Sequence, residues 1–98
     1  MTILKPEQNP SLAWRSIEGE VVVISPEEGI MHELNETASF IWNLADGKHT
    51  SVEIANRLAE EFEVPLEVAC ADTEELIALL RDRHLLLDSS GVEGPGNA

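Results

Sequence analysis

The sequence is poor in several residue types, and each shortage argues against a class of protein. It holds one cysteine, Cys70, so no internal disulfide can form. Tyrosine is absent and aromatic residues make up 4% of the chain, too few for a surface on which bases stack. Lysine and arginine total 6 against 19 acidic residues, a net charge of −13. Such acidity repels phosphate, so we expect neither nucleic acid nor a membrane as partner. It favours a basic peptide or a basic protein patch, or serves solubility alone.

Long apolar runs are missing as well. The longest, residues 21–24 and 85–87, cannot span a bilayer. Residues 1–6 lack the apolar stretch of a signal peptide. We therefore expect a soluble cytoplasmic protein, and its 98 residues suit one domain with a core of modest size.

No motif for a metal, a cofactor or catalysis is visible. His32, His49 and His84 are widely spaced, and the chain has neither a CxxC pair nor a glycine-rich nucleotide loop. Cys70 has acidic neighbours, which oppose formation of a thiolate, so a small helical residue is the better interpretation than a nucleophile. We expect no cofactor, no metal and no enzyme activity.

The first half of the chain predicts a three-stranded antiparallel meander. Strands are expected over residues 12–17, 20–24 and 30–34. Glu18-Gly19 forms a two-residue turn in which glycine supplies a positive φ. The connections are too short for crossovers, so neighbouring strands run antiparallel.

The second half predicts three helices. Asn35 caps the first, Thr50 and Glu53 form a capping box for the second, and Pro65 suits the start of the third. The stretch 85–87 adds a final strand or packs back on the core. The fold class is therefore α+β, a winged helix-turn-helix-like arrangement of the sheet packed on three helices. Residues 1–11 are expected to be flexible, 12–87 to form the domain and 88–98 to be a disordered tail.

The third helix has two distinct faces on a helical wheel. Its core face holds Ala69, Thr73, Leu76, Ile77 and Leu80. One flank of that face holds Val68, Asp72, Glu75 and Leu79. A flank that is part apolar and part acidic, beside a strand edge, makes a groove. In the competing interpretation, Val68 and Leu79 only widen the buried stripe.

The strand over residues 30–34 is a sheet edge if the strands pair in sequence order. Ile30, His32 and Leu34 then lie on one face of the sheet, and Met31 and Glu33 on the other. An edge offers unpaired amides and carbonyls, which a charge such as Glu33 can protect or which an incoming peptide can pair with. The same edge also allows a homodimer.

An ordered set of short segments resembles the PqqD family over residues 20–87. The set comprises residues 34–38, Ile41-Trp42, Asp46-Gly47, residues 54–58, Phe62, Asp72, Leu80 and Leu85. The resemblance implies a RiPP recognition element, a peptide-binding module in which a three-stranded sheet packs on three helices. Such modules bind the leader segment of a ribosomally made precursor peptide and deliver it to a modifying enzyme, often a radical-SAM enzyme. The founding case makes pyrroloquinoline quinone.

In this family the leader adds as a strand beside the third strand and lies against the third helix. Carried onto this chain, the pairing strand is Ile30, Met31, His32, Glu33 and Leu34. The helical wall comes from the wheel and not from a family motif; it comprises Val68, Asp72, Glu75, Leu76 and Leu79. One departure is His84, where many relatives have a glycine after the third helix, so the helix end can differ.

Three other functions fit parts of the sequence. The helix-turn-helix pattern is typical of DNA-binding regulators, but residues 66–83 hold Glu67, Asp72, Glu74, Glu75 and Asp82 against Arg81 and Arg83, the wrong sign for a DNA groove. Acyl carriers need a serine at a helix start, and Ser51 lies inside a capping box. An enzyme lacks a catalytic constellation. Another protein-interaction adaptor also remains open.

Overall fold

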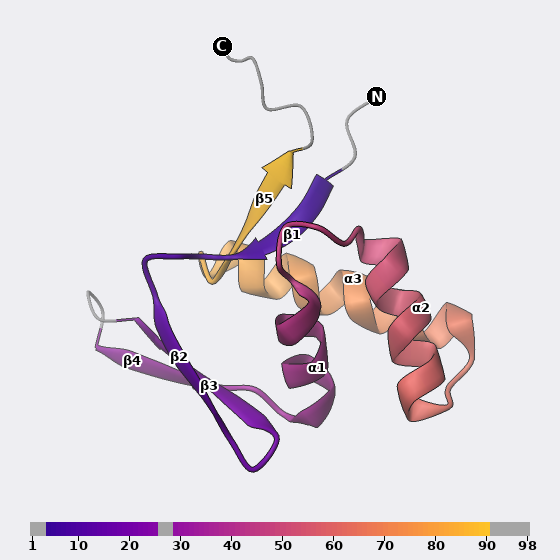
Figure 1. Cartoon of the computed structure of the whole chain (residues 1–98), viewed down its shortest axis with the longest axis horizontal. Helices are drawn as coiled ribbons and strands as arrows, with labels where there is room; N and C mark the ends of the chain where they lie inside the picture. The colour runs from indigo at the N-terminus through magenta and orange to yellow at the C-terminus, as the bar shows by residue number, and fades with distance from the viewer. Residues whose placement is uncertain (1–3, 26–28, 91–98) are drawn as a thin grey trace.

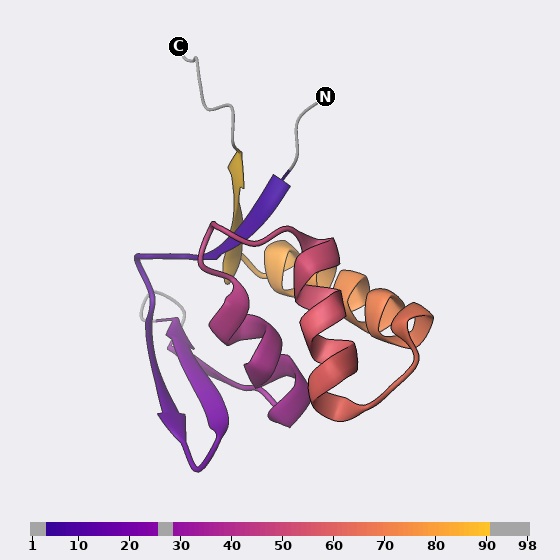
Figure 2. The same cartoon turned by 45° about the vertical axis from the view of Figure 1, so that its right-hand side comes forward.

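Three helices pack beside a three-stranded antiparallel sheet (Figure 1). The computed structural model describes residues 4–25 and 29–90. In chain order the elements are β1 (Leu4–Gln8), β2 (Ala13–Ile17), β3 (Glu20–Ser25), β4 (Ile30–Glu33), α1 (Glu36–Leu44), α2 (Ser51–Phe62), α3 (Leu66–Asp82) and β5 (Leu86–Ser90). In Figures 1 and 2, α1 lies between the sheet and α2. The predicted α+β class, with a three-stranded antiparallel sheet on three helices, is confirmed.

The sheet has the strand order β2-β3-β4 and is the meander that the short connections predict. In its first turn, Glu18 and Gly19 have φ values of 53° and 87°. Positive φ at both central residues is the type I′ geometry, whose twist matches that of the paired strands. The glycine therefore acts as predicted, and Glu18 adopts the same left-handed region without being a glycine.

A buried serine joins the sheet to α1. The Ser39 hydroxyl accepts a hydrogen bond from the Val21 amide at 2.8 Å and donates one to the Leu34 carbonyl at 3.1 Å. Asn35 follows as the predicted N-cap, and its side chain accepts from the Ala38 amide at 2.8 Å. These bonds fix how the end of β4 meets the start of α1.

The core lies where the sheet and the three helices meet. Its fully buried large side chains are Trp42, Ile41, Ile54, Leu58, Leu85, Leu86, Val21 and Val23. Trp42 is 0% exposed. The ring of Trp14 stands edge-on to it, with centroids 5.9 Å apart and planes at 78°. This T-shaped arrangement adds to the stabilisation that burial provides.

The start of α2 has the predicted capping box. The Thr50 hydroxyl accepts from the Glu53 amide at 3.1 Å, and the Glu53 carboxylate accepts from the Thr50 amide at 2.8 Å. The bond from the Thr50 amide is the main reason why the pKa of Glu53 lies below its ordinary value. Because the pKa is lowered on folding, the contribution to stability is present above the ordinary glutamate pKa and is lost as the pH falls through the lower, folded one.

The N-terminal segment corrects the sequence prediction. Residues 1–11 were expected to be flexible, but β1 pairs with β5 as an antiparallel two-stranded ribbon. β1 is also held by the loop between α1 and α2. The Gln8 amide donates to the Ala45 carbonyl at 2.9 Å, and the Gly47 amide donates to the Pro6 carbonyl at 3.0 Å. The partners of β1 lie far along the chain, so its own polar, proline-containing sequence does not reveal them.

The C-terminal end is corrected in the same way. The stretch 85–87 was predicted to add a strand or to pack on the core, and it does both: Leu85 and Leu86 are buried, and β5 begins at Leu86. Residues 88–90 were expected in the disordered tail but belong to β5. Residues 91–98 lie outside the described residues. The folded unit thus extends beyond 12–87 on both sides.

Candidate functional site

The exposed edge of β4 is the first component of the site. β4 lies at one end of the sheet, as the predicted strand order required. The Leu34 amide donates to the Val21 carbonyl at 2.8 Å across the β3–β4 pairing. Because bonded pairs alternate along an antiparallel ladder, Met31 and Glu33 direct their backbone amides and carbonyls away from β3. In the part of the chain that the structure describes, no strand pairs with that side.

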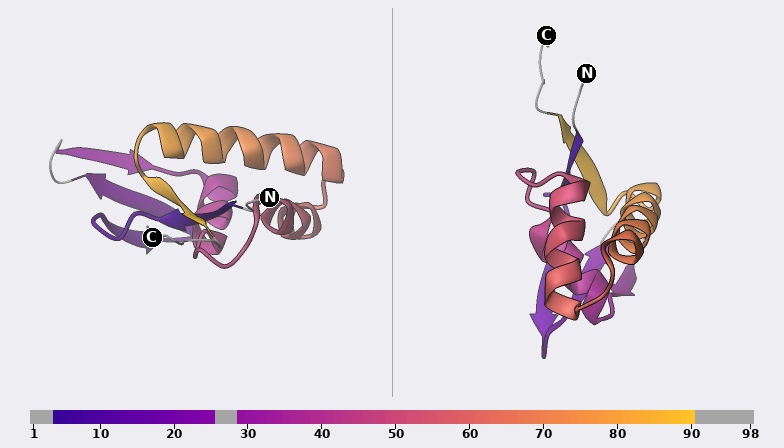
Figure 3. Two further views of the ribbon diagram at one scale, coloured as in Figure 1. Left: turned by 90° about the horizontal axis from the view of Figure 1, so that it is seen from above. Right: turned by 90° about the vertical axis from the view of Figure 1, so that its right-hand side faces the viewer.

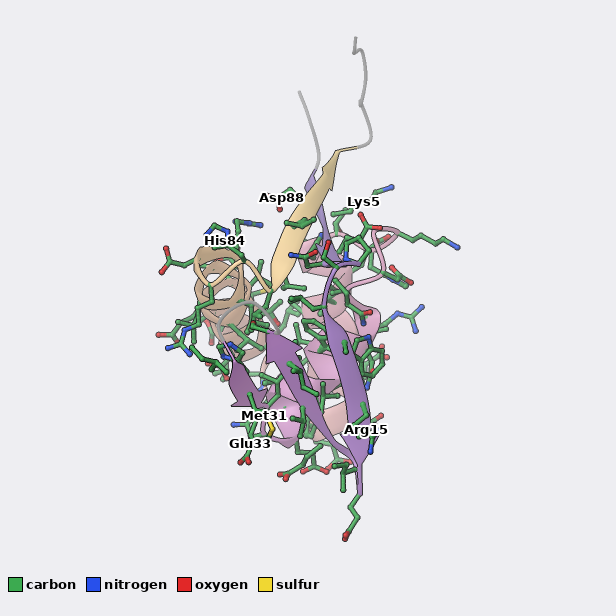
Figure 4. The ribbon with its side chains drawn as sticks, turned by 90° about the vertical axis from the view of Figure 1, so that its left-hand side faces the viewer. Lys5, Arg15, Met31, Glu33, His84 and Asp88 are labelled. Carbon is green, nitrogen blue, oxygen red and sulfur yellow. The ribbon has the colours of Figure 1, made fainter. Side chains whose placement is uncertain are left out.

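Side chains of β4 alternate between the two faces of the sheet. Figure 4, which views the molecule from the side of the sheet, shows Met31 and Glu33 close together on β4 with the helices behind. In the register, His32 pairs with the buried Val23, so its side chain is on the face that the helices cover. Leu34, on that same face, is buried. This is the predicted alternation.

α3 supplies the second component. The core face predicted from the wheel is buried at Ala69, Thr73, Ile77 and Leu80, and Leu76 is half-buried. On the flank, Asp72 and Glu75 are exposed, and Val68 and Leu79 are exposed by 43% and 44%. Val68 and Leu79 therefore do not simply widen the buried stripe. An apolar and acidic flank stays open to solvent.

A groove lies between β4 and the C-terminal part of α3. In the left view of Figure 3, the C-terminal end of α3 comes near β4. The groove encloses about 670 Å³. Its lining residues are Ile30, Met31, His32, Glu33, Leu34, Asn35, Ala38, Leu76, Leu79, Leu80, Asp82, Arg83, His84 and Leu85. One wall thus offers backbone hydrogen-bonding groups and the other offers leucine side chains.

The groove continues past the end of β4 along the start of α1. This second part encloses about 440 Å³ and is lined by Asn35, Thr37, Ala38, Ile41, Asp72, Glu75, Leu76 and Leu79. Asn35, Ala38, Leu76 and Leu79 line both parts. The two parts therefore adjoin, and together we call them the β4–α3 groove.

Nine of the ten residues named from the sequence line the β4–α3 groove. Ile30 to Leu34 line the first part, Asp72 and Glu75 the second, and Leu76 and Leu79 both. Val68 lines neither part, although it is exposed on the same flank. The structure therefore brings together the strand and helix positions that the sequence could only list separately.

Several lining residues were not named from the sequence. The floor includes Ala38 of α1, whose small side chain leaves room between β4 and α3. At the C-terminal end of α3, Asp82, Arg83 and His84 also line the groove. The sequence carried one usable signal, because Asn35 caps a helix that begins directly after the strand predicted to be the edge.

His84 shapes this end of the groove (Figure 4). It has a φ of 62°, in the left-handed region. The His84 amide donates to the Arg81 carbonyl at 3.0 Å, and the Leu85 amide donates to the Leu80 carbonyl at 2.8 Å. This pair of bonds is a Schellman motif, which usually has glycine at the left-handed position. The chain thus keeps the glycine-type helix end with a histidine in place.

Charge in the groove is predominantly acidic. Its lining includes the carboxylates of Glu33, Asp72, Glu75 and Asp82 and the guanidinium of Arg83. The ion pairs among the described residues lie elsewhere, between His49 and Asp46 and between Arg81 and Asp88.

At Asp46, outside the groove, burial raises the pKa, but hydrogen bonds from the Lys48 amide and the His49 ring outweigh it and lower the pKa below its ordinary value. The described residues contain no cluster of three His, Cys, Asp or Glu side chains that could hold a metal ion. None of the described helices is long and apolar enough to cross a membrane.

The family model for coenzyme PQQ synthesis protein D (PqqD) matches residues 20–86. The chain belongs to the PqqD family. The match covers β3, β4 and all three helices; it leaves out β1 and β2 and ends at the first residue of β5. A comparison with curated proteins finds no match.

Solved structures share the fold. Lasso peptide synthetase B1 complexed with the leader peptide is 23% identical, with a TM-score of 0.75 over 85% of this chain and 98% of that one. TbiB1 in complex with the TbiA(beta) leader peptide is 22% identical, with a TM-score of 0.74 over 93% and 99%. The PqqD part of Methylobacterium extorquens PqqCD, described as a stand-alone RiPP recognition element, is 24% identical, with a TM-score of 0.68 over 84% and 87%.

Proposed function

We propose that this PqqD-family protein binds the leader segment of a ribosomally synthesised precursor peptide in the β4–α3 groove. The leader adds to β4 as a fourth strand, pairing with the outward backbone groups of Met31 and Glu33. Its side chains lie against Leu76 and Leu79 of α3. The observation that carries the proposal is an unpaired strand edge facing an exposed apolar flank across an open groove.

The family and the fold support this proposal. Two of the structurally similar proteins are described as leader-peptide complexes, and a third as a recognition element. We further propose that the protein is not a catalyst itself and presents the bound leader to a modifying enzyme of the radical-SAM class. The groove supplies backbone pairing and apolar contact, which suit binding a chain rather than breaking its bonds.

An NMR titration tests the binding site. Isotope-labelled protein is titrated with the precursor peptide encoded beside its gene. Strand addition predicts amide shifts concentrated at residues 29–34 and along α3. Shifts confined to β1 and β5, or no shifts at high peptide concentration, would contradict the proposal. The same edge could pair two copies of the chain, so the molecular mass in solution is measured with and without the peptide.

A substitution in the α3 wall gives the sharpest test. We expect Leu79→Glu to abolish leader binding, because it replaces an apolar contact with a carboxylate that the bound peptide would desolvate. Leu79 is exposed by 44%, so the fold should be retained. Val52→Glu, at an exposed site on α2 outside the groove, is the matched control and should bind normally. If Leu79→Glu and Val52→Glu bound the leader equally well, α3 would not be part of the binding site.

A further inference from the structure

The charges along the β4–α3 groove are unevenly distributed, and their arrangement restricts which leader can fit. Among the described residues, the part beside α1 is lined by the carboxylates of Asp72 and Glu75 and by no basic side chain. Arg83 lines the other part, beside β4, together with His32 and His84. The part of the groove beside α1 thus has acidic side chains with no basic one to balance them, whereas the part beside β4 has both acidic and basic side chains.

The remaining arginine of the C-terminal part of α3 does not offset this acidity. The Arg81 guanidinium donates to the Asp88 carboxylate of β5 at 2.6 Å and does not line the groove. Neither Asp72 nor Glu75 takes part in an ion pair among the described residues. Two exposed carboxylates on adjacent turns of one helix therefore line the groove without a paired cation among the described residues.

We propose that the groove selects leader segments with a lysine or arginine that contacts Asp72 and Glu75. This inference rests on the proposed function and identifies the chemistry of the segment that is bound. A basic side chain there offsets the repulsion between the two carboxylates. It also forms ion pairs with them at the edge of the apolar contact between the leader and α3. Its long stem can cover apolar surface near Leu76 while the charge stays hydrated.

The geometry also predicts where this basic residue lies in the leader. Both pairings in the sheet are antiparallel, and a strand added to β4 in the same way runs from the Asn35 end of the groove toward Arg83. The N-terminal side of the bound segment therefore meets Asp72 and Glu75. Residues on one face of a strand repeat every ~6.7 Å, close to the ~6 Å between positions i and i+4 of a helix. A side chain over Glu75 is thus two residues before the apolar side chain over Leu79.

A displayed random-peptide library tests this even when the leader itself has not been identified. Peptides that bind are selected from the library separately with the wild-type protein, the Asp72→Asn/Glu75→Gln variant and the Leu79→Glu variant. Glu60→Gln/Glu61→Gln is the matched control, because it removes the same charge from exposed positions on α2 outside the groove. Both double variants keep side-chain shape, so their folding should match that of the wild type.

The wild type and the control should select peptides with lysine or arginine two residues before an apolar residue. The Asp72→Asn/Glu75→Gln variant should lose this bias and bind a wild-type-selected peptide about fivefold more weakly at low salt, as two exposed ion pairs imply. The difference should shrink as salt is added.

The outcomes separate the two proposals. Selected peptides that bind Leu79→Glu as well as the wild type would overturn the proposed function, and this inference with it. Peptides that need Leu79 but show no basic bias, or the same bias on the Asp72→Asn/Glu75→Gln variant, would overturn the inference alone. A basic residue consistently after the apolar one would overturn the antiparallel placement on which the spacing depends.

Discussion

The two edges of the sheet have similar backbones but different surroundings. β2 and β4 both flank β3, and each has one side without a strand partner among the described residues. Only β4 faces an exposed helical flank across a groove. All five residues of β2 are exposed, and Trp14 reaches inward to Trp42. Under the proposed function, the two edges differ because the apolar wall beside β4 would give an added strand side-chain contacts as well as backbone pairing.

Among substitutions that compare the two edges, the largest effect is expected from blocking each edge with proline. Met31→Pro removes an outward amide from β4 and places a ring where a peptide strand would pair. We expect leader affinity to fall by about 2 kcal/mol, roughly thirtyfold. Ser16→Pro makes the same change on the outward side of β2 and should leave affinity unchanged. Isothermal titration calorimetry measures both, with circular dichroism to verify the fold. Similar losses in the two variants would mean that the edges do not differ in function.

A second prediction concerns the support behind β4. Ser39→Ala removes the acceptor of the Val21 amide and the donor to the Leu34 carbonyl, both buried. The free energy of unfolding should fall by about 1.5 kcal/mol. Thr73→Val is the contrasting core change, because the buried Thr73 hydroxyl has no hydrogen-bond partner among the residues that the structure describes. It should leave stability unchanged or raise it. Urea denaturation measures the free energy of unfolding of both variants. A Ser39→Ala protein as stable as the wild type would show that the two hydrogen bonds of Ser39 do not contribute to stability.

The smallest effect is expected at the helix ends. His84→Gly and Glu63→Gly each place glycine at a left-handed position, where φ is 62° and 53° respectively. Each should stabilise the protein by about 0.5–1 kcal/mol, since a side chain is strained there. Only His84 lines the groove, so only His84→Gly should change leader affinity. Thermal unfolding and calorimetry together test this pair; lower stability in either variant would mean that the histidine or glutamate side chain makes a compensating contact.

Much of the fold could be predicted because its signals are local. Asn35 and the Thr50–Glu53 capping box mark helix starts through bonds that span three residues. Glu18-Gly19 closes a hairpin between adjacent strands. Signals between residues that are near in sequence could not predict β1. Its partners are β5 and the loop after α1, and its sequence, with Pro6 inside the strand, is typical of a flexible lead-in.

The candidate site shows the same division. The alternation along β4 and the wheel of α3 identified nine residues of the groove and the exposed acidic flank. Val68 was included because it lies on that flank, but its place along the helix puts it outside the cavities. Asn35, Ala38 and His84 were missed, because their contribution depends on how α1 and the end of α3 approach β4.

By itself, the sequence determined the element types, the antiparallel meander, the core face of α3 and the acidity of the chain, because each follows from composition or from contacts between near neighbours. Only the tertiary structure decided that the edge of β4 lies opposite Leu79, that Arg81 is paired with Asp88 and that Asp72 and Glu75 line the same groove. Those relations join residues that are distant in the chain, and packing of the three helices on the sheet is what brings them together.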